Sequence, residues 1–235
     1  MKIIYIKKIN FLFIMLIMVV CVAVCLNKNG MIIETNSTPA ANKIVILDAG
    51  HGAPDYGTQS TSGTTEQELN LAITLKLQQL LEQSGTKVIL TRSDDNGIYE
   101  VDKDSIRSKK ISDMKNRVYI GNNSEADIYV SIHMNYYTDS KYSGWQTFYQ
   151  SRSENSKSLA IIIQQSLNEN IEQNKRVPMA IKGAYIMDKV EIPAVIVECG
   201  FLSNKNDEEN LKTDEYQSKL AWGIYVGLQR YFDDI

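Results

Sequence analysis

An apolar run that ends in a glycine-flanked histidine places the strongest constraint on the fold of this chain. Residues 44–49 read IVILDA and lead directly into Gly50, His51 and Gly52. Continuous Val and Ile residues bounded by glycine are typical of strands that are buried on both faces of a parallel sheet. Because such sheets carry their chemistry just beyond the carboxyl ends of their strands, we expect His51 to lie at a functional edge.

The second histidine of the chain repeats this arrangement. Residues 127–133 read DIYVSIH and residues 193–200 read PAVIVECG, so His133 and Glu198 each end an apolar run. The chain contains 2 histidines, and both therefore occupy such a position. An ionisable side chain is costly to bury without a partner. Together with His51, these positions predict a site where the strands end.

Amphipathic helical patterns alternate with the apolar runs. Residues 66–84 place Leu69, Ile73 and Leu77 on one face at helical spacing. This alternation predicts an α/β fold with about six strands in a layered domain. The other predicted helices span residues 111–123, 156–171 and 213–232, and the other predicted strands span residues 87–91, 145–149 and 184–187.

The start of the first predicted helix carries a carboxylate with two possible roles. Thr65 and Glu68 predict a capping box, which makes Glu66 the first helical residue. A carboxylate there could favour the helix dipole. It could equally project toward the strand ends, where His51 is expected.

The N-terminal residues form a separate segment. Within residues 1–27, lysines near the start precede an uninterrupted apolar stretch at residues 11–26. This pattern predicts a signal peptide or a signal anchor, and therefore export. No good small-residue cleavage site follows, which favours membrane attachment through an uncleaved segment. Residues 28–42 are polar and predict a linker, which leaves residues 43–235 as the main domain.

Charge argues against nucleic-acid binding, and cysteine content argues against an internal disulfide. The formal net charge of −3 gives no indication of nucleic-acid binding. Cys21 and Cys25 lie in the N-terminal apolar stretch, so the predicted domain keeps Cys199 alone and has no internal disulfide. Since Cys199 belongs to an apolar run, a small buried side chain is favoured over a reactive thiol.

Two histidines and a carboxylate form a standard open zinc site that leaves a fourth position for water. Zinc lowers the pKa of that water to roughly 7, and a carboxylate outside the metal shell then serves as general base and acid. The candidate ligands are His51, Glu66 and His133, with Glu198 as the candidate base. Spacing alone leaves open that the histidines are buried structural residues and that Glu198 is a paired structural carboxylate. The helix-borne HExxH pattern of many zinc peptidases is absent.

Four ordered motifs extend this pattern over most of the chain. They are LDAGHG at residues 47–52, EQELNLAITLKL at 66–77, NRVYIGNNSEADIYVSIHMN at 116–135 and PAVIVECGFLSN at 193–204. With these motifs, nearly all of residues 43–233 resemble the zinc-dependent N-acetylmuramoyl-L-alanine amidases of the amidase-3 family. The resemblance implies a twisted, mostly parallel sheet flanked by helices.

The resemblance also implies the chemistry. By this likeness His51, Glu66 and His133 bind Zn²⁺, and Glu198 is the catalytic carboxylate. The implied substrate is peptidoglycan. The implied reaction hydrolyses the amide that joins the lactyl group of N-acetylmuramic acid to L-alanine of the stem peptide.

The chain departs from the family pattern at several positions. Family members usually have Pro at Ala49, Gly at Ala53 and a small residue at Met134, and a basic residue is common near Asp188. These departures remove neither a ligand nor the base. They therefore bear on the fit of the substrate rather than on the type of reaction.

Further residues have roles that the sequence leaves open. Arg117 and Asn135 match family positions. We expect a structural role for Arg117, whereas Asn135 could orient His133 or contact substrate. The tyrosine-bearing loop at residues 136–144 and Trp145 could stack on sugar rings or serve as packing residues.

The signal-bearing chain carries no wall-binding repeat, and in this it resembles the sporulation amidases that prepare muramic-δ-lactam in spore cortex. Such a domain is expected to act on the extracytoplasmic side and to depend on its membrane segment or on an accessory exported protein for recruitment or activation. Another zinc hydrolase of the cell wall, such as a carboxypeptidase or a sugar deacetylase, is one alternative. A non-catalytic wall-binding module is the other alternative. The presence of all three candidate ligands and of the candidate base Glu198 disfavours it.

Overall fold

The computed structural model describes residues 13–18, 38–172 and 174–234. Residues 13–18 are helical and belong to the N-terminal unit, which ends at Ser37. Most of the predicted signal segment and linker lies outside the described residues. Among the helices that are described, none combines the length and apolar character that crossing a membrane requires.

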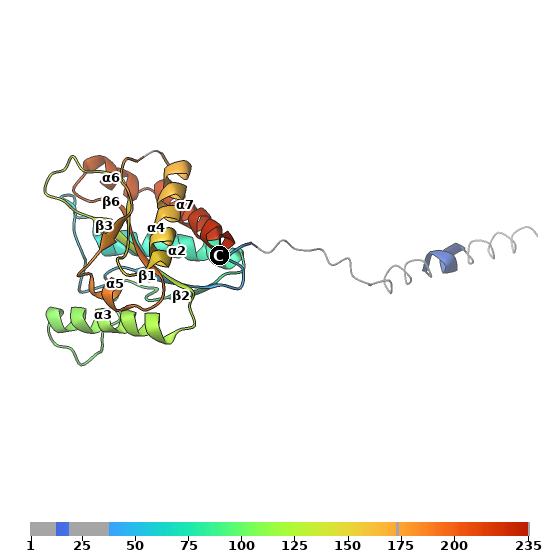
Figure 1. Ribbon diagram of the computed structural model, residues 1–235, viewed down its shortest axis with the longest axis horizontal. Coiled ribbons are helices and arrows are strands. Elements are labelled where there is room, and N and C mark those ends of the chain that lie inside the picture. Colours follow the sequence, from blue (N-terminus) through green and yellow to red (C-terminus); the bar gives the residue numbers. More distant parts are fainter. Residues whose placement is uncertain (1–12, 19–37, 173, 235) are drawn as a thin grey trace, which may run out of the picture. The chain divides into compact units, whose positions relative to one another are not determined.

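A single six-stranded sheet organises the chain from residue 38 onward (Figure 1). The strand order is β2-β1-β3-β6-β4-β5. β2, β1, β3 and β6 are parallel, β4 runs antiparallel to β6, and β5 is parallel to β4. The predicted α/β fold with a mostly parallel sheet is therefore confirmed. The strands are β1 (Ile44–Ala49), β2 (Lys87–Leu90), β3 (Ile128–Asn135), β4 (Gln146–Gln150), β5 (Met179–Ile181) and β6 (Ala194–Phe201).

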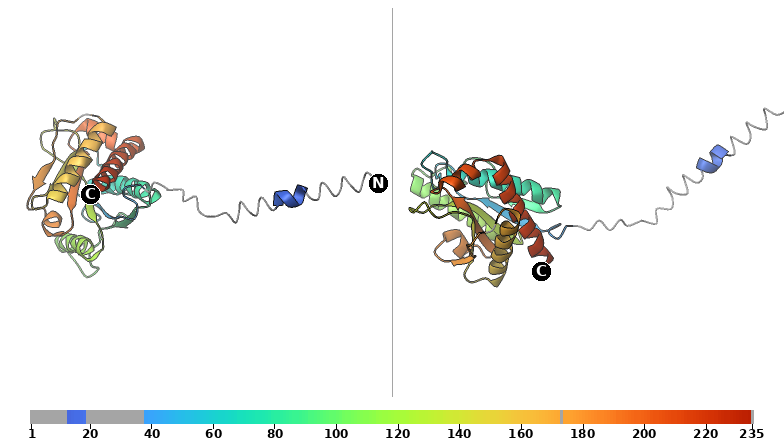
Figure 2. Two further views of the ribbon diagram at one scale, coloured as in Figure 1. Left: turned by 45° about the vertical axis from the view of Figure 1, so that its right-hand side comes forward. Right: turned by 90° about the horizontal axis from the view of Figure 1, so that it is seen from above.

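Helices cover both faces of the sheet, with α2, α4 and α7 packed together on one face and α3 and α5 on the other (Figures 1 and 2). The short helix α6 follows β6 and leads into α7. The bounds are α2 (Glu66–Gln83), α3 (Ile106–Asn123), α4 (Glu154–Asn170), α5 (Tyr185–Lys189), α6 (Lys205–Leu211) and α7 (Asp214–Asp233).

Alternate residues of each central strand supply the two cores. Val195 and Val197 of β6 face the larger core under α2, α4 and α7, whereas Ile196 packs against the smaller core beside α3 and α5. Leu77 of α2 is fully buried in the larger core, as its helical spacing predicted. Burying one such side chain stabilises the fold by about 1.5–3 kcal/mol. Packing against the two cores restrains the sheet. The side chains at the carboxyl ends of the parallel strands are therefore held in place as well.

Three local predictions are wrong. Residues 184–187 do not form a strand, because Tyr185 begins helix α5 and the short edge strand β5 lies before it. A short apolar run does not distinguish a helix from a strand. Thr65 is the N-cap of α2, but its side chain makes no capping hydrogen bond, so the expected capping box is absent. Helix α3 begins at Ile106 instead of residue 111, because Ser105 and Ser108 form a capping box there.

Candidate active site

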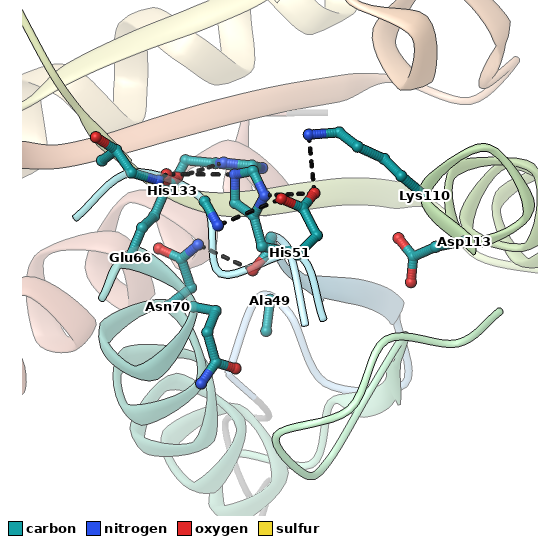
Figure 3. A network of polar contacts seen from close by, with 12 residues as sticks. Ala49, His51, Glu66, Asn70, Lys110, Asp113 and His133 are labelled. Atoms are coloured by element: carbon teal, nitrogen blue, oxygen red, sulfur yellow. Dashed lines mark hydrogen bonds and ion pairs between the residues drawn. The ribbon is translucent and has the colours of Figure 1, made fainter. Parts of the chain in front are cut away.

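The side chains of His51, Glu66 and His133 meet at the carboxyl-terminal edge of the parallel strands (Figure 3). One donor atom from each residue lies within 4.8 Å of the other two. Nε2 of His51 lies 3.3 Å from Oε2 of Glu66, and Nδ1 of His133 lies 2.9 Å from Oε1 of the same carboxylate. The structure thus brings together three candidate ligands from three separate segments.

This donor set fits a zinc ion. Tetrahedral zinc holds nitrogen and oxygen ligands at about 2.0–2.2 Å, which spaces neighbouring ligand atoms about 3.3 Å apart. The separations of 3.3 Å from His51 to Oε2 of Glu66 and of 2.9 Å from His133 to Oε1 lie close to that spacing, and one atom from each of the three residues lies within 4.8 Å of the others. Two imidazoles and a carboxylate also leave the fourth position open, as hydrolytic zinc sites require. Among the described residues, this is the one group of three or more potential ligands that converges in this way.

Two glycines make room for the cluster. A Cβ atom at Gly50 would lie 2.3 Å from the ring of His133. A Cβ atom at Gly57 would lie 2.5 Å from Oε2 of Glu66, and Gly57 also has a left-handed backbone with φ +69°. At both glycines, the connection between β1 and α2 therefore approaches the candidate ligands at a distance that only glycine permits.

Glu66 projects from the first turn of α2 toward the strand ends. Its Oε2 accepts a hydrogen bond from the backbone N–H of Thr58 (2.9 Å), and its Oε1 accepts one from the backbone N–H of Met134 (3.1 Å). Burial opposes ionisation of Glu66, but hydrogen bonds from His133 and His51 outweigh it and hold its pKa well below the usual range. Of the two roles that the sequence left open, the geometry favours that of an ionised ligand.

Asp55 is a site residue that sequence patterns did not reveal. Its Oδ2 lies 3.0 Å from Nδ1 of His51 and 2.9 Å from Nζ of Lys110 (Figure 3). An ionised carboxylate only accepts hydrogen bonds, so we assign the Nδ1 proton to this contact, which turns Nε2 toward Glu66. Burial lowers the pKa of His51, yet Asp55 and Glu66 overcome that effect and raise it to about 9. The same negative field attracts a cation.

Arg117 anchors the backbone beneath His51. His51 has φ +62°, a left-handed conformation that is uncommon outside glycine. The Arg117 guanidinium donates to the carbonyl of His51 and pairs with Asp48 and Asp113. Its side chain is 2% exposed. These contacts agree with the structural role predicted for Arg117.

Glu198 faces the same cluster from β6. It is the register partner of His133 on β3 and of Gln146 on β4. The predictions that His133 and Glu198 end their strands are wrong, because β3 continues to Asn135 and β6 continues to Phe201. Burial raises the pKa of Glu198 to about 7; His133 opposes the rise and Glu66 adds to it. Its Oε2 is buried and has no hydrogen-bond partner among the described residues. A carboxyl that titrates near neutrality with a free oxygen is suited to proton transfer.

Three other candidate residues do not enter the cluster. Oδ1 of Asn135 accepts a hydrogen bond from the N–H of Tyr136, whereas the ring of His133 contacts Glu66. In the part of the chain that the structure describes, Asn135 and His133 form no hydrogen bond with each other. Trp145 is 1% exposed, which removes it as a stacking surface for sugars. Cys199 is fully buried, and burial raises the pKa of its thiol far above the usual range. A buried neutral thiol is inert, as predicted.

Comparison with known proteins identifies the family. A model of the N-acetylmuramoyl-L-alanine amidase family matches residues 45–230, a span that includes every residue of the cluster and Glu198. The chain belongs to this family.

Individual relatives agree with this amidase assignment. The germination-specific N-acetylmuramoyl-L-alanine amidase of Bacillus subtilis strain 168 is 35% identical over 198 residues, covering 84% of this chain and 83% of the relative. The CwlD amidase from Clostridioides difficile, solved in complex with the GerS lipoprotein, has a TM-score of 0.81 and 43% identity over 83% of this chain and 100% of its own. An N-acetylmuramoyl-L-alanine amidase from Clostridium difficile 630 has a TM-score of 0.71 and 31% identity over 83% of this chain and 98% of its own.

The amidase reaction follows from this membership. The enzyme hydrolyses the amide between N-acetylmuramic acid and L-alanine of the peptidoglycan stem peptide. The alternatives of a carboxypeptidase, a sugar deacetylase or a non-catalytic wall-binding module are therefore set aside.

Proposed function

We propose that this amidase depends on zinc, which His51, Glu66 and His133 hold while Glu198 serves as general base and acid. The observation that carries the proposal is the free, buried oxygen of Glu198 beside a group of three ligand atoms that lie within 4.8 Å of one another. Family membership supports metal dependence as well.

When bound, zinc supplies Lewis acidity, which lowers the pKa of water to roughly 7 and polarises the scissile carbonyl. Glu198 accepts a proton from the attacking water at its free Oε2. It then delivers that proton to the departing nitrogen of L-alanine. The products are a lactyl carboxylate on the sugar and a peptide with a free amino terminus. A carboxyl with a pKa near 7 can both take up and release a proton at neutral pH.

We propose spore cortex as the setting of the reaction, where it prepares muramic-δ-lactam. Similarity to the germination-specific amidase of Bacillus subtilis and to the CwlD amidase supports this setting. Digestion of purified vegetative wall and spore cortex tests it. Free cleavage of vegetative wall with poor cleavage of cortex would contradict a cortex-specific role.

We further propose that an accessory exported protein recruits or activates the enzyme outside the cytoplasm. The relative with a TM-score of 0.81 was solved in complex with a lipoprotein, which supports a partner of this general kind. Residues 1–27 are proposed as the signal or anchor segment on the basis of their sequence pattern. Purification from membranes that yields no partner, with full activity of the isolated chain, would contradict the recruitment proposal.

Zinc content and muropeptide release, measured on the unaltered chain and on Glu198→Gln, test the catalytic proposal. We expect stoichiometric zinc in both proteins and a loss of about 10²–10⁴-fold in peptide release from the variant. Glu68→Gln is the matched control, since this exposed carboxylate lies in the same helical turn as Glu66. Equal release from Glu198→Gln and the unaltered chain would remove Glu198 from catalysis. Absence of zinc would remove the metal proposal.

A further inference from the structure

A second pocket, of about 550 Å³, lies on the β4 side of the active site. One wall is the loop that leads into β4, including Tyr142 and Gly144, and another is the segment with Arg176. Asp207 at the start of α6 and Tyr216 at the start of α7 complete it. β4 runs antiparallel to β6, so its first residues lie at the same sheet edge as the carboxyl ends of β3 and β6. The pocket and the catalytic cluster therefore lie at the same end of the strands.

A row of side chains across three strands connects the pocket with the active site. His133 of β3, Glu198 of β6 and Gln146 of β4 are successive register partners. Since neighbouring strands lie about 4.8 Å apart, about 10 Å separates the first residue of this row from the third. Oε1 of Gln146 accepts a hydrogen bond from Nη1 of Arg176 at 3.1 Å. Arg176 thus continues the row that begins at the metal-ligand cluster.

The guanidinium of Arg176 is held in a fixed position. Its Nε donates to the carbonyl of Ser143 at 2.9 Å. Its Cζ lies 4.4 Å from the centroid of the Phe201 ring and 5.6 Å from that of Tyr142. A guanidinium stacked on aromatic rings is pre-organised and loses little freedom when it binds an anion.

This guanidinium has unused binding capacity. Within the described residues, Arg176 forms no ion pair with a carboxylate, and its recorded hydrogen bonds use Nε and Nη1 only. Asp207 interacts electrostatically with Arg176 but, in the described part of the chain, forms no ion pair with it, and its Oδ2 accepts the backbone N–H groups of Phe201 and Gly144 at 2.9 and 2.8 Å. The charged residues that line the pocket are Lys141, Lys175 and Arg176 against Glu172 and Asp207.

We infer that this pocket binds a free carboxylate of the stem peptide, with Arg176 as the anchoring residue. Stem peptides carry free carboxylates, whereas in the uncleaved substrate the lactyl carboxyl of the sugar is tied up in the scissile amide and carries no charge. A planar guanidinium with free N–H groups matches a carboxylate through two parallel hydrogen bonds. The peptide side of the substrate then extends from Glu198 across Gln146 toward β4. This inference rests on the amidase reaction and on the catalytic position proposed for Glu198.

Two soluble substrates test the inference on the full chain. One is a disaccharide that carries L-alanyl-D-glutamate with free carboxylates, and the other is its diamide. For each, kcat and KM are measured with the unaltered chain, Arg176→Gln and Arg176→Lys. Lys182→Gln is the charge-matched control, because Lys182 is exposed and follows β5 at the opposite edge of the sheet.

We expect Arg176→Gln to lower the ratio of kcat/KM for the carboxylate over the diamide by about 10- to 100-fold, mainly through KM. Arg176→Lys keeps the charge but lacks the planar fork. Its ratio of kcat/KM should therefore fall between the ratios of the unaltered chain and of Arg176→Gln. Lys182→Gln should leave the ratio unchanged. An equal loss on both substrates, or a loss confined to kcat, would show a structural role for Arg176 and overturn the inference.

Binding measurements separate this inference from the proposed catalytic mechanism. Calorimetric titration of Glu198→Gln and of the double variant Glu198→Gln/Arg176→Gln with both substrates needs no turnover. Preference for the carboxylate in the first protein and its loss in the second would support the pocket even if neither substrate were hydrolysed by the unaltered chain. Equal affinity of Glu198→Gln for both substrates would overturn it.

Discussion

Oδ2 of Asp55 and Nδ1 of His51 lie 3.0 Å apart, and the other nitrogen of the same ring lies 3.3 Å from the carboxylate of Glu66. One imidazole therefore joins a supporting carboxylate to a candidate metal-ligand cluster. Carboxylates in this position fix the orientation and tautomer of a ligating histidine and increase its basicity.

Asp55→Asn should weaken zinc binding about 10- to 100-fold, because the amide no longer fixes the Nδ1 proton or contributes its charge. Competition with a chromophoric chelator measures the affinity directly. Asp214→Asn is the control, since Asp214 is an exposed carboxylate on α7 that pairs with Lys76. Unchanged affinity in Asp55→Asn would show that His51 is oriented by the backbone alone.

Gly50→Ala should abolish zinc binding and amidase activity, because the added Cβ would lie 2.3 Å from the ring of His133. Gly183→Ala provides a contrast: its Cβ meets no atom within 4 Å, and its cost arises only from φ +81°. We expect Gly183→Ala to lose about 1 kcal/mol of stability while it retains zinc. Zinc content and thermal unfolding of both variants test this difference, and full zinc in Gly50→Ala would contradict it.

Asp48 should make the free energy of unfolding depend on pH in the acidic range. Burial opposes its ionisation, but Arg117 and the hydroxyl of Ser131 hold its pKa at about 2, below the ordinary 3.8. A depressed pKa stabilises the fold at pH values above about 4, and this contribution of about 2 kcal/mol is lost as the pH falls toward 2.

Asp48→Asn should remove this acid dependence and lower the free energy of unfolding at pH 7 by about 3 kcal/mol, because the buried Arg117 loses a partner. Urea unfolding at pH 7, 4 and 3 measures both effects. The exposed Asp214→Asn should change neither by more than about 0.5 kcal/mol. A variant that keeps the steep acid loss of the unaltered chain would assign that loss to another carboxylate.

Cys199→Ala should keep the amidase rate and lose about 1 kcal/mol of stability. Cys199 is fully buried and its thiol is neutral, so it contributes packing rather than chemistry. Muropeptide release and urea unfolding test the two parts of this prediction. A large loss of rate at full zinc occupancy would require a catalytic thiol.

The patterns of single elements were sufficient to predict most of the fold. The Val and Ile runs before Asp48, His133 and Glu198 became adjacent parallel strands, since a run buried on both faces has few alternatives. Because parallel strands end on the same side of a sheet, the sequence alone places His51, His133 and Glu198 together. Glu66 depended on the resemblance to a family, because its pattern fits a helix-dipole role equally well.

Contacts between distant segments account for what was missed. Asp55 contacts Lys110 of α3, and Arg176 contacts Gln146 of β4. The residues of each pair lie far apart in the sequence, so the spacing of residues within one helix or strand does not reveal the contact. The apolar run at residues 184–187 was compatible with either a strand or a helix, and packing of Met187 in the smaller core accompanies the helix.

His133 and Glu198 lie inside paired strands, whereas Tyr142 and Arg176 belong to connecting segments beside them. Bond-breaking and recognition thus reside in parts of the chain that can change independently of each other. Exchange of the segments at residues 136–144 and 172–178 between relatives is therefore a practical route to redirect this hydrolase toward differently amidated peptides. The reacting centre need not be rebuilt for that purpose.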